Sequence, residues 1–129
     1  MHASFIRNED GLIIINAFLD AETKAHLVFD TGCTHTTIDK NALAFLDFKF
    51  SERIDSVLIE TGNGIVLTDR YKLNDFKALG IKKDEYIIQV YDFLAHGILS
   101  DYDSILGLDF LEGYHFCIDT LTNEITIHN

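Results

Sequence analysis

The segment Leu27–Gly32 reads Leu-Val-Phe-Asp-Thr-Gly and places one carboxylic acid directly after three large apolar residues. A run of this kind is typical of a buried strand, so Asp30 stands where that strand reaches the protein surface. Gly32 lets the backbone turn back tightly, and the hydroxyl of Thr31 can hold the loop in place. Asp-Thr-Gly is also an ordinary turn sequence. A rigidly held, partly desolvated carboxylate at this place is nevertheless suited to acid–base chemistry.

A second apolar segment, Ser104–Leu111, follows much later in the chain and reads Ser-Ile-Leu-Gly-Leu-Asp-Phe-Leu. Its acid, Asp109, does not precede Thr-Gly, and we expect it to cap a short helix or to bind loop backbone. Between the two segments, Asn63 and Gly64 separate two β-prone runs. This dipeptide is the strongest short-range hairpin signal, because both residues tolerate positive φ. The pattern therefore predicts a β-hairpin between the two acid-bearing segments.

Most of the remaining chain reads as short strands bounded by Gly, Asn and Asp, because the sequence contains no proline. One helix is expected from the apolar spacing of residues 42–46, with Asp39 as its cap. A short helical turn is expected from about Leu108 to Glu112, with Gly113 ending it. The expected strands are 12–19, 26–29, 56–60, 65–71, 86–91, 104–106 and 124–127, the last in a terminal hairpin around Thr122 and Asn123. Three tyrosines should lie on strands with their hydroxyls in solvent, namely Tyr71, Tyr86 and Tyr91.

Length and charge exclude several classes of function. The chain has 129 residues, with 10 Lys and Arg against 21 Asp and Glu and a formal net charge of −11, so residues 1–129 are expected to form one domain. Such an acidic protein repels phosphate backbones and anionic lipid, which makes nucleic acid and membranes poor partners. No apolar run approaches the ~20 residues of a transmembrane helix, and the first residues carry no secretory signal. Cys33 and Cys117 read as reduced thiols, so a cytoplasmic location is expected.

The order of these features resembles the retropepsin-like aspartic proteases over roughly Leu12 to Ile127. The shared features are the apolar-apolar-Asp-Thr-Gly loop, a Gly-rich hairpin at the position of the flap, and Ile-Leu-Gly followed by Asp-Phe-Leu. The resemblance implies a mainly β fold, a closed antiparallel β-barrel of the acid-protease type with one or two short helices. Cys33 is a departure, because Ala or Ser commonly follows Asp-Thr-Gly in this family, but its small side chain keeps the packing.

The resemblance also implies roles for individual residues. Asp30 matches the catalytic aspartate, Thr31 the threonine that braces two active-site loops, and Gly32 the glycine that brings backbone close to the aspartates. Gly107 matches the glycine of the second apolar segment, which packs beside the catalytic loop. Neither a metal nor a cofactor is implied. The substrate-binding flap is expected at Gly62, Asn63, Gly64 and Ile65.

Proteolysis by this route needs two carboxylates that share one proton around a water molecule. One carboxylate acts as general base on the water, and the protonated partner polarises the scissile carbonyl. This chain has a single Asp-Thr-Gly and therefore supplies half of such a site. We expect a symmetric homodimer with Asp30 of each subunit at the two-fold axis and with a peptide or protein as substrate.

Three other functions remain open from the residues alone. A catalytically silent peptide-binding or dimerisation module can use the same fold. Cys33 and His35, together with His115 and Cys117, form two doublets that could supply the four ligands of a zinc site. A cysteine hydrolase that uses Cys33 and a histidine requires a Cys–His pair in space, which spacing alone does not establish.

Overall fold

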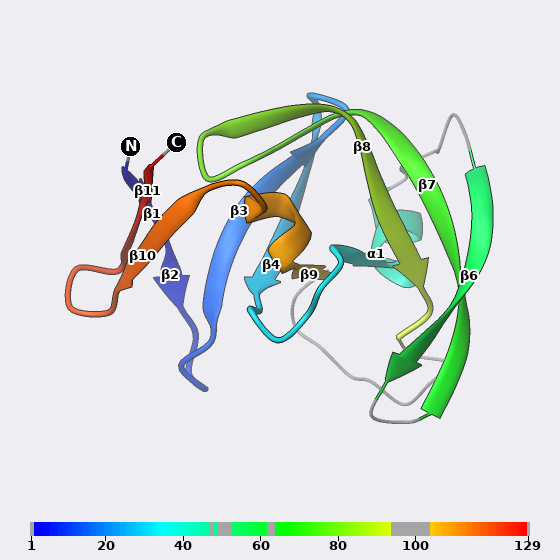
Figure 1. Cartoon of the computed structure of the whole chain (residues 1–129), viewed down its shortest axis with the longest axis horizontal. Coiled ribbons are helices and arrows are strands. Elements are labelled where there is room, and N and C mark those ends of the chain that lie inside the picture. The colour runs from blue at the N-terminus through cyan, green and yellow to red at the C-terminus, as the bar shows by residue number, and fades with distance from the viewer. Residues whose placement is uncertain (1, 47, 49–52, 62–63, 94–103, 129) are drawn as a thin grey trace.

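The molecule is built around a closed β-barrel, seen in a computed structural model that describes residues 2–46, 48, 53–61, 64–93 and 104–128. The strands of its main sheet are β2 Ile6–Arg7, β3 Ile13–Leu19, β4 Thr23–Phe29, β5 Thr37–Asp39, β6 Arg53–Thr61, β7 Gly64–Ala78, β8 Ile81–Tyr91 and β9 Ser104–Leu106. Their order is β2-β3-β4-β9-β5-β8-β7-β6, and an additional pairing of β3 with β7 closes six of them into a ring (Figure 1). The predicted mainly β, closed-barrel fold is confirmed.

Two of the barrel pairings are parallel, and they set the position of Asp30. β4 runs parallel to β9, with Phe29 opposite Leu106, and β5 runs parallel to β8. The other pairings of the ring are antiparallel. Because Phe29 and Leu106 end their strands side by side, the two loops that follow, at Asp30 and Gly107, leave the sheet together. The short strand β5 was not predicted from the sequence.

Two tight turns with left-handed residues connect the hairpins of the ring. β3 and β4 are joined through Asp20 and Ala21, whose φ angles are 49° and 71°. The carboxylate of Asp20 accepts the N–H of Asn74 at 2.8 Å, which ties this turn to β7. β7 and β8 are joined through Leu79 and Gly80, with φ of 53° and 76°. The turn between β3 and β4 therefore stabilises the β3–β7 pairing that completes the barrel.

A second sheet brings the two ends of the chain together. Its order is β1 (His2–Ser4), β11 (Glu124–His128) and β10 (His115–Asp119), with both pairings antiparallel. This terminal sheet contains the predicted terminal hairpin, and Asn123 in its turn has φ 56°. Its inner face packs on the barrel, where the ring of Phe116 meets that of Phe29 edge to face at 5.9 Å.

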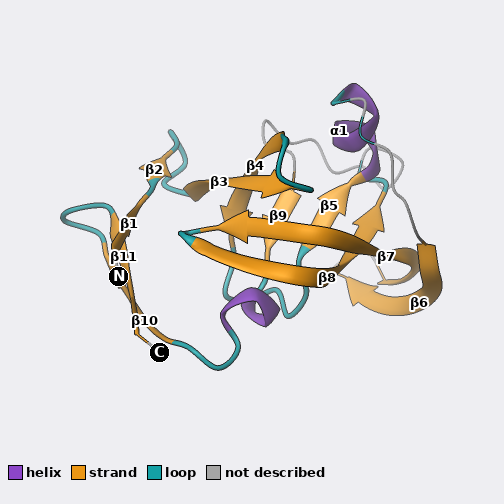
Figure 2. Ribbon diagram, turned by 90° about the horizontal axis from the view of Figure 1, so that it is seen from above, coloured by secondary structure: helices purple, strands orange, loops and turns teal. Residues whose placement is uncertain are grey.

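The predicted Asn-Gly hairpin is confirmed as an arm formed by β6 and the first half of β7. The two strands pair antiparallel up to Thr61 opposite Gly64. Near the base of this arm, the guanidinium of Arg70 donates to both carboxylate oxygens of Asp55 at 2.7 and 2.6 Å. Figure 2 shows the arm at the opposite end of the molecule from the terminal sheet.

The two predicted helical segments are also confirmed, with slightly different bounds. Helix α1 spans Lys40–Phe45, and the carboxylate of its N-cap Asp39 accepts the N–H of Asn41 at 3.2 Å. The 3-10 helix η2 spans Leu108–Leu111, and Gly113 follows it with φ 87°. Within the described ranges, no helix is long and apolar enough to cross a membrane.

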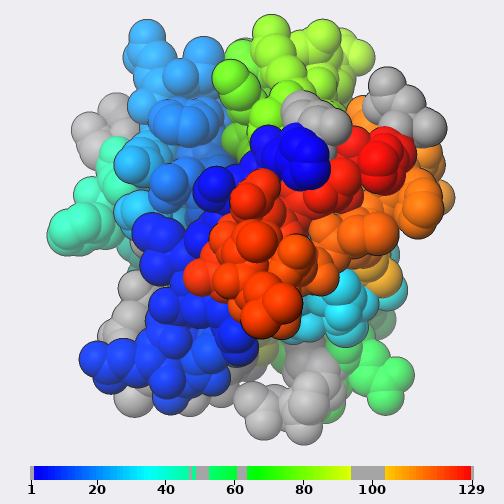
Figure 3. All heavy atoms as spheres, turned by 90° about the vertical axis from the view of Figure 1, so that its left-hand side faces the viewer, coloured from blue at the N-terminus to red at the C-terminus, as the bar shows by residue number. Residues whose placement is uncertain are grey.

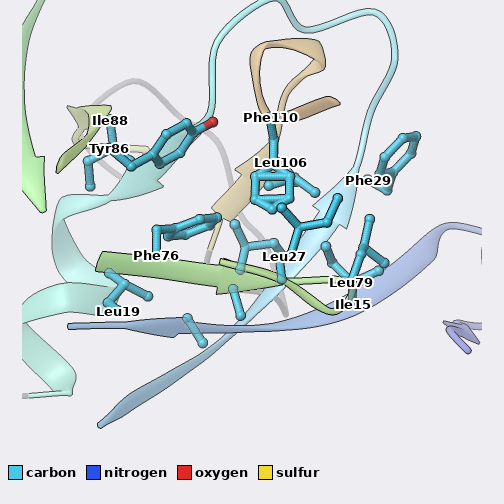
Figure 4. Close-up of a cluster of buried hydrophobic side chains, with 14 of the residues drawn as sticks. Ile15, Leu19, Leu27, Phe29, Phe76, Leu79, Tyr86, Ile88, Leu106 and Phe110 are labelled. Atoms are coloured by element: carbon cyan, nitrogen blue, oxygen red, sulfur yellow. The ribbon is translucent and has the colours of Figure 1, made fainter. Parts of the chain in front are cut away.

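Three aromatic rings form the centre of the core beneath the Asp30 loop. Phe76 stacks on Tyr86 with ring centroids 4.9 Å apart, and Phe110 meets these two rings edge to face at 5.4 and 5.8 Å. Leu27 and Leu106, from the two parallel strands, belong to the same buried cluster (Figure 4). Burial of each such side chain contributes about 1.5–3 kcal/mol. The two loops of the site therefore begin from strands held by a close-packed core.

Candidate active site

Asp30 lies at the end of β4, in the first residue of the loop that leaves the sheet. Its N–H donates to the carbonyl of Leu106 at 3.2 Å, so the loop starts hydrogen-bonded to the end of β9. Its Oδ1 accepts the N–H of Gly32 at 2.8 Å. The side chain of Asp30 is exposed in the single chain. The partial desolvation expected from the sequence is therefore not present in the single chain.

The turn at Thr31 and Gly32 is tight because the backbone folds back on Asp30. The N–H of Cys33 donates to the carbonyl of Asp30 at 3.1 Å. A Cβ at Gly32 would lie 3.2 Å from Oδ1 of Asp30, which leaves little room for any side chain. Thr31 and Gly32 are both exposed. The turn thus exposes the carboxylate of Asp30, the hydroxyl of Thr31 and the backbone of Gly32.

The segment around Gly107 lies directly against this loop. The N–H of Leu108 donates to the carbonyl of Cys33 at 2.8 Å, and that of Asp109 to the carbonyl of Thr34 at 3.2 Å. A Cβ at Gly107 would lie 2.5 Å from the backbone carbonyl carbon of His35. Only glycine fits such an approach of two backbones. The two segments singled out in the sequence are therefore packed as one unit.

A buried hydroxyl joins the two segments from beneath. Oγ1 of Thr36, which is fully buried, donates to Oδ1 of Asp109 at 2.9 Å and accepts the N–H of Gly107 at 3.1 Å. The hydroxyl of Tyr86 lies 2.9 Å from the same Oγ1. Oδ1 of Asp109 also accepts the N–H of Thr36 at 3.0 Å, so the expectation that this acid binds loop backbone is confirmed. The expectation that Tyr86 and Tyr91 reach solvent is wrong, because both side chains are buried.

We expect Thr36→Val to lower the free energy of unfolding by about 1–3 kcal/mol, although the two side chains have nearly the same shape. Without the hydroxyl, the N–H of Gly107 and the hydroxyl of Tyr86 lose a partner in a buried place. Urea unfolding followed by circular dichroism measures the loss. Thr34→Val is the matched control, because Thr34 is exposed and its hydroxyl lies 3.0 Å from Nδ1 of the adjacent His35. Equal stabilities of the two variants would contradict the structural role of Thr36.

A cavity of about 540 Å³ opens beside Asp30. Its floor comes from the loop that begins at Asp30 and the adjacent strands, and its far side comes from the β6 arm. On the arm, Ile59 and Glu60 line the cavity. The remaining lining residues are Gly32, Cys33, Thr34, His35, Thr37, Gln89, Tyr91, Phe93 and Ile105. Asp30 is thus at the edge of a largely apolar cleft that is bounded by the hairpin arm.

The four residues predicted for the flap have different outcomes. Gly62 and Asn63 lie outside the described residues. Gly64 is exposed with φ 104°, and Ile65 is 71% exposed and opposite Glu60 on the paired strand. Ile65 is not part of the cavity lining, whereas its cross-strand neighbour Glu60 is.

Sequence reasoning missed most of the cavity wall. Ile59 lies one residue before Glu60 on β6, and because adjacent residues of a strand point to opposite faces, the alternation does not predict that both line the cavity. Gln89 and Tyr91 lie on β8 and Ile105 on β9, strands that were predicted without any assignment of their faces. The local patterns did not show that these strands border the same space.

The four-ligand zinc site is wrong for the single chain. His115 and Cys117 do share the exposed face of β10, whereas Cys33 and His35 lie on the loop after Asp30. All four are described residues, and among the described residues no group of three or more His, Cys, Asp or Glu could hold a metal ion.

The geometry also disfavours Cys33 as a nucleophile paired with His35. Burial raises the pKa of the Cys33 thiol, and the carboxylates of Asp30 and Asp109 raise it further. The thiol donates to the carbonyl of His35 at 3.0 Å, while Nδ1 of that ring lies 3.0 Å from Oγ1 of Thr34. A reactive cysteine needs a stabilised thiolate. The loop stabilises the protonated thiol instead.

Comparison with known proteins agrees with this geometry. The sequence profile of the family described as retroviral aspartyl protease matches residues 6–129. The crystal structure of a retropepsin-like aspartic protease from Rickettsia conorii is similar to the chain, with a TM-score of 0.70 and 25% identity, covering 99% of this chain and 98% of that one. A comparison with curated protein sequences gives no match. Because the family match includes the Asp30 loop, the hairpin arm and the Gly107 segment, the chain belongs to the retroviral aspartyl protease family.

Proposed function

We propose that the protein is an aspartic endopeptidase whose active site forms between two copies of this chain, with one Asp30 from each. The observation that carries the proposal is the exposed carboxylate of Asp30 at the edge of a 540 Å³ cleft. The other acid of the paired segments, Asp109, is engaged by the N–H and the hydroxyl of Thr36. The two paired segments of one chain therefore offer a single exposed carboxylate for the reaction, and a second copy supplies the other.

The reaction follows from two such carboxylates held close together. Because both cannot remain ionised at short distance, the pair holds one shared proton. The ionised Asp30 accepts a proton from the attacking water, and the protonated Asp30 of the other copy donates a hydrogen bond to the scissile carbonyl oxygen. The hydrogen bond from Gly32 to Oδ1 fixes the orientation of each carboxylate. Thr31 of each loop would brace the other loop across the two-fold axis.

A peptide is the substrate that fits this cleft. Its apolar wall, formed by Ile59, Tyr91, Phe93 and Ile105, suits an apolar side chain of the substrate next to the cleaved bond. The β6–β7 arm, which carries the predicted flap, would close over the bound chain. Cys33 and Cys117 are both free, which favours a reducing compartment such as the cytoplasm.

The proposal predicts that peptide hydrolysis depends on dimerisation. On serial dilution, the turnover per chain should fall once the concentration drops below the dissociation constant of the dimer, because monomers hold half a site. Sedimentation velocity at the same concentrations measures the fraction of dimer. The two curves should coincide, and a strictly monomeric protein with undiminished turnover per chain would rule out the two-chain site.

A further inference from the structure

The outward face of the terminal sheet carries three of the six histidines of the chain. Ile125 and Ile127 of β11 are buried against the barrel, so the alternate residues of this sheet point outward. Figure 3 views this side of the molecule and shows the first and last strands next to each other, in blue, orange and red. The outward histidines are His2, His115 and His128, and all three are exposed.

Two of these histidines form a cross-strand pair. His115 on β10 lies directly opposite His128 on β11. Their ring centroids are 5.6 Å apart, and the ring planes are inclined by 44°. His2 is turned to other groups, because its Nδ1 lies 3.0 Å from Oγ1 of Thr126 and 3.7 Å from the carboxylate of Glu124. His115 and His128 are therefore placed to act on one ligand together.

We propose that His115 and His128 form a two-histidine site for a divalent transition metal ion such as Zn²⁺ or Ni²⁺. Imidazole nitrogen suits these ions and binds them at ~2 Å. Two imidazoles held tetrahedrally on one ion have ring centroids roughly 5 Å apart at that bond length, close to the separation of this pair. Since the described residues provide no group of three ligands, water completes the coordination shell.

A metal at this site would act on folding rather than on the chemistry at Asp30. It would link β10 to β11 on the outer face of the terminal sheet. Phe116, the residue after His115, packs from the inner face on Phe29, which precedes Asp30. An ion that binds the folded sheet and not the unfolded chain raises the stability of this support for the catalytic loop.

Thermal unfolding with NiCl₂ or ZnCl₂ tests the site, with MgCl₂ as the control for ionic strength. At a free metal concentration ten times the dissociation constant, the unfolding equilibrium constant should fall about eleven-fold, and the Tm should rise accordingly. His115→Ala and His128→Gln should each abolish the rise. His2→Ala and Cys117→Ser, which alter the same face, should retain it.

Isothermal titration of the folded protein with NiCl₂ gives a second readout, which does not depend on the stability of any variant. One ion per chain should bind, and binding should be lost in both the His115 and the His128 variants. The absence of any metal-dependent rise in Tm would overturn the proposal. A rise that persists in His115→Ala and His128→Gln, or that disappears in His2→Ala or Cys117→Ser, would also overturn it.

Discussion

Asp30→Asn is expected to lower peptide hydrolysis by about 10²–10⁴-fold or more while leaving the fold intact. The asparagine oxygen can still accept the N–H of Gly32, which now lies 2.8 Å from Oδ1, so the loop keeps its shape. The side chain is exposed in the single chain, and substitutions at such places change stability by roughly 0.5 kcal/mol or less. In the proposed two-chain site, what is lost is the ability to accept a proton from water and to share one with the Asp30 of the other copy.

The measurement is turnover of a peptide library by purified wild-type and variant protein, with unfolding curves and sedimentation velocity on both. Glu60→Gln is the matched control, because Glu60 is the other acid among the described residues that line the cleft. It should retain most of the turnover, since its carboxylate is on the arm and not on the loop that begins at Asp30. Equal cleavage by Asp30→Asn and wild type would remove the assignment of Asp30.

The same experiment separates the protease from the catalytically silent module. A statine-type peptide inhibitor mimics the transition state of aspartic proteases and should bind the wild-type protein and block its turnover. Binding of the inhibitor without any turnover by the wild type would support the silent module instead. Loss of inhibitor binding in Asp30→Asn, with dimerisation unchanged, would place the inhibitor on the two carboxylates.

The position of Asp30 could be predicted because adjacent residues determine it. Three apolar residues end a buried strand, and a glycine two residues after the acid permits the turn. The helix cap at Asp39 and the Asn-Gly hairpin are equally local, and the structure confirms both. Such features depend on a few neighbouring backbone angles, so a short pattern carries enough information.

The long β7–β8 hairpin could not be predicted from local sequence patterns of this kind. In β7, Leu73 is buried, and towards the end of the strand Phe76 and Ala78 are buried. The alternation of buried and exposed residues therefore shifts by one residue between Leu73 and Phe76. On the opposite strand, Glu85 has φ 53°, an irregularity that changes which face each side chain occupies. The turn at Leu79 and Gly80 also lacks the usual polar residues, so neither the strand period nor the turn was visible in the sequence.

Contacts between segments that are far apart in the sequence could not be predicted either. Tyr86 was expected to reach solvent, yet its hydroxyl lies 2.9 Å from Oγ1 of Thr36, fifty positions earlier in the chain. The parallel pairing of β5 with β8 creates this contact, and β5 has only three residues. A strand this short has no periodicity to detect. The hydrogen-bonded contact beneath the two loops was therefore accessible only from the three-dimensional structure.

Gly107→Ala is expected to be among the most destabilising single substitutions in the chain, at about 3–5 kcal/mol. Its added Cβ would lie 2.5 Å from the carbonyl carbon of His35 and 2.8 Å from its oxygen and from the nitrogen of Thr36. All three are backbone atoms and cannot rotate away. The two loops must then separate, which breaks the hydrogen bonds from Leu108 to Cys33 and from Gly107 to Thr36.

Gly113→Ala is the control that distinguishes the steric clash at Gly107 from the effect of backbone strain. Gly107 has φ −90°, which any residue adopts, so its substitution is purely a steric change. Gly113 has φ 87°, and beyond its chain neighbours no atom of the described residues lies within 4 Å of the position of a Cβ, so its substitution adds strain of roughly 1–2 kcal/mol and no clash. Urea unfolding of both variants should therefore show the greater loss at Gly107. The clash at Gly107 also displaces the loop that begins at Asp30, so any folded Gly107→Ala protein should hydrolyse peptide more slowly than Gly113→Ala. Equal rates and stabilities of the two variants would show that the two loops are not held by this contact.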